Sequence, residues 1–262
     1  NGDFYHDYNG DGSFYLYLKG ANPKDYFNRI EIGTTEYLLR GQWQDADGKY
    51  ARKNVTIENL AIQYCSNTAM DFAHSDNITI KGCEFSWIGG AYNESGNTCY
   101  GNAITLWRDN SNITVYQCSF YQIYDAAVTF QGNKPNYTTT EPYTEYINLK
   151  FDQLLIEYSS MNFEYWGSNS KLWETEGNES LKPQTIMRNI SFTNSIVRFG
   201  GYGYGGINRA SKSSQGCMLG WNFTYYDTDT IENFNIQDNI FDKSDCNIFY
   251  SPESLNSRMT IS

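Results

Sequence analysis

A nine-residue segment recurs six times along the chain without gaps, and this repeat limits the possible folds more than any other feature. Each copy begins with Asn and carries apolar residues at its second and fourth positions, the alternation of a strand with one buried face. The sixth position holds a residue that tolerates a bend, and apolar positions follow it. The copies are NVTIENLAI from Asn54, NITIKGCEF from Asn77, NITVYQCSF from Asn112, NLKFDQLLI from Asn148, NISFTNSIV from Asn189 and NFNIQDNIF from Asn233.

A further short run follows most copies and reads as a third strand: AMDFA at Ala69, AITLW at Ala103, AVTFQ at Ala127, NFEYW at Asn162 and NIFY at Asn247. Three short strands per repeat, with long insertions between repeats, predict an all-β fold: a right-handed parallel β-helix (solenoid) of at least six coils. Coils stacked about 4.8 Å apart would align equivalent residues in columns. The Asn and Gln residues at the sixth-position bends would form an amide ladder that satisfies buried polar groups. Cys83 and Cys118 would be stacked core thiols.

The motifs NVTIENLAI, TAMDFAHSDNITIKGCEF and GNAITLWRDNSNITVYQCSF, in this order, resemble the pectin-lyase-like β-helix superfamily over roughly residues 54–250. The fuller pattern FSWIGG, GNAI, IYDAAVTFQG and FEYW is similar to bacterial carbohydrate-active β-helix proteins grouped near glycoside hydrolase family 141. The resemblance implies a substrate groove on the outer face of the third strand. The acidic calcium motifs and the Arg of pectate lyases are not visible, nor are the NTD, DD and GHG motifs of polygalacturonases, so these two activities are disfavoured.

We expect residues 1–50 to form irregular N-terminal strands that lead into the solenoid, and residues 51–262 to form one continuous β-helix domain. No capping helix is visible at either end, although the bare edge of a β-helix must be covered. The chain begins within the polar run NGDFYHDYNGDG, which indicates a partial or processed chain. The Gly- and Asn-rich insertions between the repeats are expected to shape a binding site.

Composition excludes several classes of partner. A net charge of −11 and a pI near 4.6 argue against nucleic acid and against an anionic membrane surface. No apolar run approaches the ~18 residues of a membrane span. The six cysteines show no CxxC or Cys/His spacing, so neither a metal site nor a cofactor is expected. Aromatic residues make up 17% of the chain, mostly Tyr, which suits a β-rich surface whose rings stack on ligands.

Eight N-x-S/T sequons predict a secreted or extracellular protein that can carry N-linked glycans. Four of them, at Asn54, Asn77, Asn112 and Asn189, are also explained by the repeat itself, because each is the first residue of a copy. The other four, at Asn93, Asn136, Asn178 and Asn222, fall in predicted loops and are the better glycosylation candidates.

Alternation along the third strand predicts which side chains face the groove. One outward column holds Asp71, Thr105, Thr129 and Glu164, and the next holds Ala73, Trp107, Gln131 and Trp166. The flanking turns add His74, Arg108 and Asp125, and the Gly-rich insertion adds Asn208 and Arg209. Trp rings stack on sugar rings, amides bond hydroxyl groups, and two carboxylates can act as acid and base or nucleophile. The sequence therefore predicts a polysaccharide-binding groove.

Asp125 and Glu164 are the predicted catalytic pair. Asp71 is three coils from Glu164, roughly 14 Å away by stacking, which is too far for a direct pair. It is therefore assigned to substrate binding, together with Trp107, Arg108, Gln131, Trp166, His74 and Arg209. Structural roles compete with each assignment. Asp125 could cap its turn, Glu164 could be solvated, Arg108 could pair with Asp109, His74 could be an ordinary turn residue, and the Trp residues could lie in an interface.

Three functions remain open from the sequence. The first is a secreted glycoside hydrolase that acts on a polysaccharide. The second is a polysaccharide lyase, which needs a base such as His74 or a Lys and a charge neutraliser such as Arg108. The third is a non-catalytic extracellular glycoprotein that binds sugars or assembles end to end through its β-helix ends.

Overall fold

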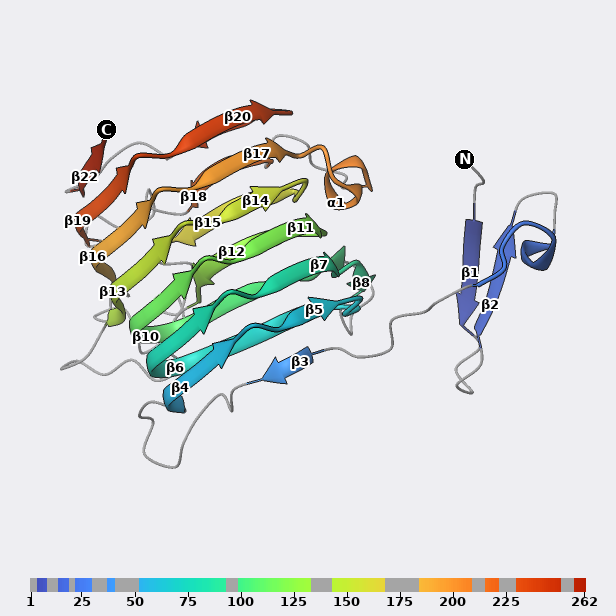
Figure 1. Ribbon diagram of the computed structural model, residues 1–262, viewed down its shortest axis with the longest axis horizontal. Coiled ribbons are helices and arrows are strands. Elements are labelled where there is room, and N and C mark those ends of the chain that lie inside the picture. The colour runs from blue at the N-terminus through green and yellow to red at the C-terminus, as the bar shows by residue number, and fades with distance from the viewer. Residues whose placement is uncertain are drawn as a thin grey trace, which may run out of the picture. The chain divides into compact units, whose positions relative to one another are not determined.

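The computed structural model describes residues 4–8, 14–18, 22–29, 37–40, 52–92, 99–132, 143–167, 184–208, 215–221, 230–250 and 257–262. The chain divides into two compact units, Asn1–Gly33 and Thr34–Ser262. In the first unit, β1 (Phe4–Tyr8) pairs antiparallel with β2 (Phe14–Leu18), and a 3₁₀ helix (Pro23–Asp25) follows (Figure 1). The expected division at residue 50 stays a prediction, and β3, which lies before residue 50, pairs with β6 of the second unit.

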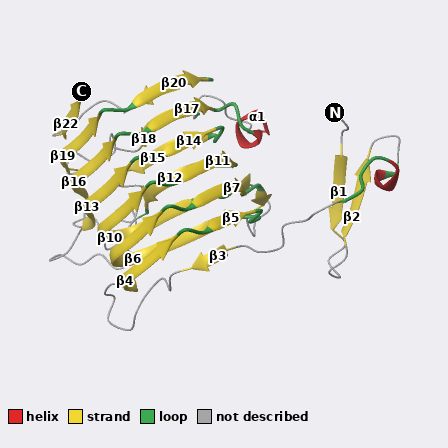
Figure 2. Cartoon of the chain, in the orientation of Figure 1, coloured by secondary structure: helices red, strands yellow, loops and turns green. Residues whose placement is uncertain are grey.

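Two parallel sheets make up most of the second unit (Figures 1 and 2), and β8 (Ala91–Tyr92) and β9 (Cys99–Tyr100) form a small antiparallel pair beside them in the sequence. The larger sheet contains β3 (Tyr37–Arg40), β4 (Arg52–Glu58), β6 (Thr68–Lys81), β10 (Ile104–Tyr116), β12 (Ala126–Gln131), β13 (Tyr143–Asp152), β15 (Met161–Trp166), β16 (Gln184–Thr193), β18 (Gly216–Trp221), β19 (Thr230–Gln237), β21 (Asn247–Tyr250) and β22 (Ser257–Ile261). The smaller sheet has the order β20 (Ile240–Ser244), β17 (Ile196–Gly200), β14 (Leu155–Glu157), β11 (Ser119–Ile123), β7 (Glu84–Ile88) and β5 (Ala61–Gln63). The prediction of a mainly β fold with parallel strands is confirmed.

The repeat found in the sequence is also the pairing register of the strands. In the larger sheet the second position of each copy pairs with that of the next copy, in the order Val55, Ile78, Ile113, Leu149, Ile190 and Phe234. In the smaller sheet the last position does the same, in the order Ile62, Phe85, Phe120, Ile156, Val197 and Phe241. Each copy therefore lies directly beside the next copy in space.

Left-handed backbone at fixed positions makes the bends of the repeat. The first-position Asn residues have φ between 55° and 58°, at Asn54, Asn77, Asn112, Asn148, Asn189 and Asn233. The sixth positions are also left-handed, at Asn59, Gly82, Gln117, Gln153, Asn194 and Asp238. Asn, Asp and Gly adopt this conformation more readily than other residues because of their short polar side chain or missing Cβ. The sequence thus repeats Asn where the backbone needs it.

An amide ladder runs along the first-position Asn residues. Asn77 Nδ2 donates to Asn54 Oδ1 at 2.7 Å, and Asn148, Asn189 and Asn233 each donate to the preceding Asn at 2.9–3.1 Å. Asn112 interrupts the series by donating to Asp76 Oδ1 at 2.8 Å. At the sixth position, where the ladder was predicted, Gln117 Nε2 donates to Gln153 Oε1 at 3.0 Å. The prediction of a buried ladder is corrected, because the longer series is exposed.

The ladder also bears on four sequons. Asn77, Asn112 and Asn189 each use Nδ2 as a ladder donor, and Asn54 is an acceptor at the start of the series. Asn148 and Asn233 belong to the ladder without being in sequons. The repeat therefore accounts for these Asn residues without a glycan. The sequons at Asn93, Asn136, Asn178 and Asn222 lie outside the described residues.

Replacing Asn148 with Ala is expected to lower the free energy of unfolding by about 2 kcal/mol, since Ala loses ladder hydrogen bonds and must hold a left-handed backbone. Asn148→Gly is the matched control, because Gly keeps the conformation but not the hydrogen bonds and should lose about half as much. Urea denaturation of both variants measures the two contributions. Unchanged stability in both would show that neither contribution matters.

A carboxylate held by several donors lies in the outward row of the larger sheet. Asp152 Oδ1 accepts from Thr193 Oγ1 and Asn194 Nδ2, both at 2.8 Å, and Lys150 Nζ is 3.4 Å from Oδ2. Burial of the carboxyl group opposes ionisation, but the two hydrogen bonds and Lys150 outweigh it, so the pKa of Asp152 is lowered from its ordinary value. A lowered pKa means that the folded state favours the charged form.

The stability that Asp152 contributes should therefore be present at neutral pH and lost as the pH falls below about 4. Asp152→Asn is expected to cost about 1–2 kcal/mol at pH 7 and much less near pH 3, measured by denaturant unfolding at each pH. Glu58, an exposed acid in the same outward row, supplies the control substitution Glu58→Gln. An Asp152→Asn loss that stays constant between pH 7 and pH 3 would contradict this account.

Aromatic residues fill the space between the two sheets. Phe85 and Phe120 stack with ring centroids 5.0 Å apart, and Phe130 contacts rings from several neighbouring strands. Cys83 and Cys118 are buried in the same core, as predicted, and burial raises the pKa of Cys118 to about 11. The Cys118 thiol is therefore protonated and unreactive at neutral pH.

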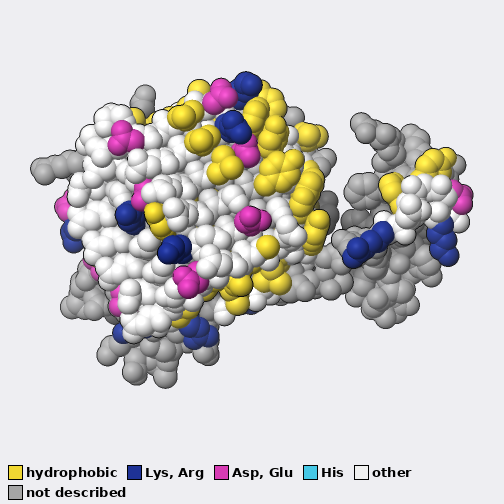
Figure 3. Space-filling model, in the orientation of Figure 1, with side chains coloured by type: hydrophobic (Ala, Val, Ile, Leu, Met, Phe, Trp, Pro, Cys, Tyr) yellow, Lys and Arg dark blue, Asp and Glu magenta, His cyan; other side chains and the backbone are white. Residues whose placement is uncertain are grey.

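A second row of left-handed residues lies at the last turn of the smaller-sheet strands, either just after the strand or one residue before its end: Tyr64, Trp87, Gln122, Tyr158, Phe199 and Lys243. Bulky side chains are rare in this conformation. Trp87 packs edge to face against Tyr121, and Tyr158 stacks on Phe199 at 4.5 Å. Figure 3 shows hydrophobic side chains gathered along the side of this unit near α1 (Tyr204–Asn208). The aromatic contacts between neighbouring strands offset part of the backbone strain.

Candidate functional site

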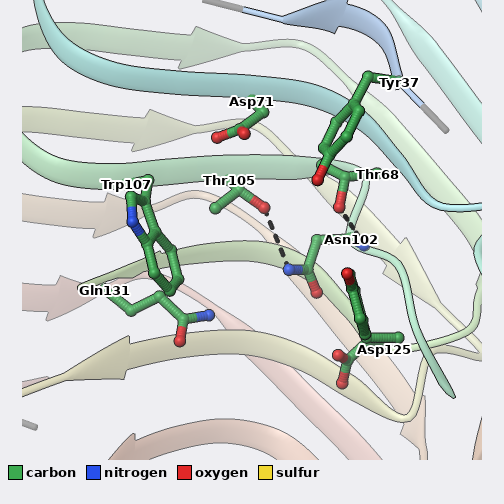
Figure 4. A pocket seen from close by; sticks show the side chains of 9 residues that line it. Tyr37, Thr68, Asp71, Asn102, Thr105, Trp107, Asp125 and Gln131 are labelled. Atoms are coloured by element: carbon green, nitrogen blue, oxygen red, sulfur yellow. Dashed lines mark hydrogen bonds between the residues drawn. The ribbon is translucent and has the colours of Figure 1, made fainter. Parts of the chain in front are cut away.

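A pocket of about 310 Å³ lies at the third-strand part of the larger sheet (Figure 4). Its described lining combines aromatic rings, amides, hydroxyl groups and two carboxylates. The lining residues are Tyr37 from β3, Thr68 and Asp71 from β6, Tyr100 from β9 (Cys99–Tyr100), Asn102 just before β10, Thr105 and Trp107 from β10, Asp125 just before β12, and Gln131 from β12. The pocket therefore uses three neighbouring strands of the repeat together with residues outside it.

The register places the predicted outward columns side by side. Asp71 pairs with Thr105, Thr105 with Thr129, and Thr129 with Glu164. Trp107 is likewise in register with Ala73 on one side and Gln131 on the other. Asp71 and Glu164 are thus three strand spacings apart, as the sequence indicated. Only the part of these columns carried by β6, β10 and β12 lines the pocket.

Asn102 organises the floor of the pocket. Its Nδ2 donates to Thr105 Oγ1 at 3.0 Å, and its Oδ1 accepts from the backbone N–H of Ala126 at 2.9 Å. Its own backbone N–H donates to Thr68 Oγ1 at 3.4 Å. Figure 4 shows Thr105 and Asn102 between Asp71 and Asp125. This side chain therefore fixes the start of β12, and with it the position of Asp125.

Asp71 and Asp125 are the two carboxylates of the pocket. Both are largely buried, with 4% and 9% of their surface exposed. Arg40 Nε lies 3.9 Å from Asp71 Oδ2 at the rim. The backbone holds the Asp125 turn on both sides, because its N–H donates to Gly101 O and its carbonyl accepts from Met161 N–H. The structure thus brings a predicted catalytic residue together with a predicted binding residue.

Glu164 is not among the described lining residues, although its strand β15 pairs with β12. Only 2% of its surface is exposed, and its Oε2 accepts from Thr129 Oγ1 at 2.8 Å. Thr129 Oγ1 in turn accepts from Gln131 Nε2 at 3.1 Å. Glu164 therefore reaches the pocket through Thr129 and Gln131.

His74, Arg108 and Trp166 are not among the described lining residues. His74 Nδ1 is 3.5 Å from Asp109 Oδ2, at the bend that follows Ala73. Arg108 occupies the equivalent bend of β10 with φ 63°. Trp166 is in register with Trp221, and their ring centroids are 5.9 Å apart. The structure describes only the backbone of Asn208, and Arg209 lies outside the described residues.

Helix α1 supports the turn that carries Asp125. Tyr204 Oη donates to Ile88 O at 2.7 Å, and its ring packs edge to face on Tyr124, the residue before Asp125. Burial raises the pKa of Tyr204, so the phenol stays a proton donor. A Cβ on Gly205 would lie 1.8 Å from the carbonyl oxygen of Tyr124, so only Gly allows this close approach. The described part of the Gly-rich insertion thus packs against Tyr124 and helps to hold the turn that carries Asp125.

Sequence reasoning missed four lining residues: Tyr37, Thr68, Tyr100 and Asn102. Tyr37 and Tyr100 lie outside the aligned repeat copies, so alternation says nothing about them. Asn102 belongs to the GNAI motif that precedes a third strand, and a polar residue at the entry to a buried strand was the available signal. These residues supply part of the aromatic and polar character of the pocket.

Comparison of the chain with protein-family models, with curated proteins and with solved structures found no match. The described residues hold no cluster of three or more His, Cys, Asp or Glu side chains that could bind a metal ion. No helix in the described part of the chain has the length and apolar character needed to cross a membrane.

Proposed function

We propose that the protein is a glycoside hydrolase that acts on a polysaccharide, with Asp71 and Asp125 as its two carboxylates. The observation that carries the proposal is that both Asp side chains line one pocket with Trp107, Tyr37 and Tyr100. Glycoside hydrolysis needs two carboxyl groups on either side of the bond that breaks. Aromatic rings offer the apolar faces on which sugar rings stack.

We also propose that the second unit is a right-handed parallel β-helix of the pectin-lyase-like type, with at least six coils. The in-register pairing of six sequence copies in two parallel sheets supports this proposal. Under this proposal the pocket lies on the outer face of the third strand, where the family resemblance implies a substrate groove.

The spacing of the strands favours an inverting mechanism. Asp71 is on β6 and Asp125 just precedes β12, with β10 between them. Two strand spacings separate them by roughly 10 Å across the sheet, and because Asp71 is level with Thr129, four residues past Asp125, their backbones are also offset by roughly 13 Å along the strands. This separation is too wide for a retaining pair, and the two side chains must point toward each other across the pocket to leave the one-water gap of an inverting pair. One carboxyl group would protonate the leaving oxygen while the other activates the water. Asn102 and Thr105, which lie between them, would bond the hydroxyl groups of the sugar.

A polysaccharide lyase is less well supported. Lysis of a uronate needs a cation to neutralise the carboxylate and a base to remove a proton. None of the described lining residues is Lys, Arg or His, Arg40 at the rim lies against Asp71, and His74 is directed to Asp109. A non-catalytic sugar-binding protein would use the same rings and amides without turnover. End-to-end assembly, secretion and N-glycosylation stay predictions.

Incubation with a panel of plant, algal and host polysaccharides, followed by product analysis, tests the proposal. New reducing ends without an unsaturated product would support hydrolysis. An unsaturated product that absorbs in the ultraviolet would identify a lyase. Binding without either product would identify a non-catalytic sugar-binding protein and refute the enzyme.

A further inference from the structure

We infer that Glu164 is a positioning residue: through Thr129 it fixes the amide of Gln131, so that the pocket selects a neutral, hydroxyl-bearing sugar over a uronate. The inference rests on the proposed function for the identity of the ligand as a sugar. It changes the role of Glu164 from a carboxylate that reacts to one that holds a binding group in place.

The direction of the hydrogen bonds follows from the chemistry of the three groups. Gln131 Nε2 can only donate, so Thr129 Oγ1 accepts that bond at 3.1 Å. The single hydroxyl hydrogen of Thr129 is then directed to Glu164 Oε2 at 2.8 Å, which must accept it. Each group thus fixes the direction of the next, and the amide of Gln131 can adopt only one orientation.

A flipped amide would meet an unfavourable contact. If Gln131 turned its Oε1 toward Thr129, two acceptor oxygens would face each other while the hydroxyl hydrogen remained on Glu164. Burial makes this costly, because Thr129 is 0% exposed and Glu164 is 2% exposed. The carbonyl oxygen of Gln131 is therefore held away from Thr129 as a fixed acceptor at the pocket wall.

The charge of the lining sets the class of ligand. The described lining residues contain two carboxylates, no Lys, Arg or His, and the oriented amide of Gln131. Acceptor oxygens bind the hydroxyl hydrogens of a neutral sugar, whereas a ligand carboxylate would meet Asp125 as a like charge. It would also have to compete with Asp71 for Arg40, whose Nε lies 3.9 Å from Asp71 Oδ2 at the rim. Arg108, the cation predicted for uronate binding, is not among these lining residues. The pocket is thus matched to a neutral ring.

Two matched pairs of probes test the selectivity: methyl glucoside with methyl glucuronoside, and methyl galactoside with methyl galacturonoside. We expect the wild-type protein to bind at least one neutral member roughly tenfold or more tightly than its uronate partner, as measured by nuclear magnetic resonance titration. Equal binding of the two members of a pair, or preference for the uronate, would overturn the inferred selectivity. Failure of all four glycosides to bind would overturn it as well.

Three substitutions test the positioning role. Thr129→Val and Glu164→Leu should each weaken neutral-sugar binding roughly tenfold and shift the side-chain amide resonances of Gln131, and the double variant should lose no more than either alone. Glu164→Gln keeps an acceptor oxygen and should bind the sugar as wild type does. Thr129→Ser, which keeps the hydroxyl group, is the control for folding and packing. If Glu164→Gln lost binding while the Gln131 resonances stayed unchanged, the positioning role would be refuted.

The outcomes separate this inference from the proposed function. A wild-type protein that shows the sugar preference and the Gln131 response, but releases no reducing ends from any polysaccharide, refutes hydrolysis alone. A protein that hydrolyses a polysaccharide but loses all turnover in Glu164→Gln, with Gln131 undisturbed, refutes the positioning role alone.

Discussion

Asp125→Asn and Asp71→Asn are each expected to reduce hydrolysis by about 10²–10⁴-fold while leaving the protein folded. Asn matches Asp in size and keeps an acceptor oxygen, but it can neither donate a proton as an acid nor accept one as a base. Both side chains line the pocket, as do the rings of Trp107 and Tyr100. The rate of release of reducing ends, measured on the polysaccharide that the wild type cleaves, gives the loss.

Glu84→Gln is the matched control, because Glu84 is an exposed acid on β7 of the smaller sheet and should be dispensable. Thermal unfolding of all three variants separates a catalytic loss from a folding defect. Binding of the polysaccharide should survive in both Asn variants, since the rings and Asn102 are unchanged. Full hydrolytic activity in both Asn variants would eliminate the pocket as the catalytic site.

The strand register could be predicted from the sequence because parallel stacking turns a sequence alignment into neighbours in space. Ile113 pairs with Ile78 and Leu149 for the same reason that it aligns with them: each is the second residue of a copy. The column from Asp71 to Glu164 follows from the same alternation. Period-2 patterns therefore carry both the pairing and the facing direction of side chains.

Facing direction does not give depth, and this limits the prediction of the site. Glu164 faces outward, as alternation indicates, but only 2% of its surface is exposed. Asp71 faces the same way as Glu164, yet Asp71 lines the pocket. Tyr37 and Tyr100 line it too, and both come from segments that no repeat copy contains. Neither segment repeats along the chain, so its position cannot be predicted by alignment with the repeat copies and depends on packing. That Asp125 and Asp71 line the same pocket could for this reason be seen only in the structure.

The amide ladder shows a similar limit. Both the first and sixth positions of the repeat bend through left-handed backbone, and both are rich in amides. The sequence cannot distinguish which of the two bends aligns its side chains with those of the next copy. Asn148 bonds Asn112, whereas Asn194 turns instead to Asp152. The carboxylate of Asp152, in the preceding copy, thus takes the hydrogen bond that Asn194 would otherwise donate to a sixth-position amide.

Phe130→Ala is expected to lower the free energy of unfolding by about 3–5 kcal/mol, the usual cost of emptying a fully buried aromatic site. Phe130 is 0% exposed and lies at the centre of the ring cluster. Its ring is 5.3 Å from Tyr146, 5.9 Å from Phe163 and 5.9 Å from Tyr165, counted between centroids. Guanidinium chloride denaturation measures the loss. Ile240→Ala, at a site that is 60% exposed, is the control and should change stability by about 0.5 kcal/mol or less.

The position of Phe130 also determines how the variant unfolds. Its ring contacts residues on β13, β15 and β19, so it joins neighbouring copies of the repeat to one another. In repeat proteins the contacts between neighbours, more than those within a repeat, make unfolding cooperative. The variant should therefore show a smaller dependence of stability on denaturant, or two separate transitions, in addition to its lower midpoint. A loss under about 1 kcal/mol with an unchanged slope would mean that other rings fill the space, and that no single aromatic residue couples the copies.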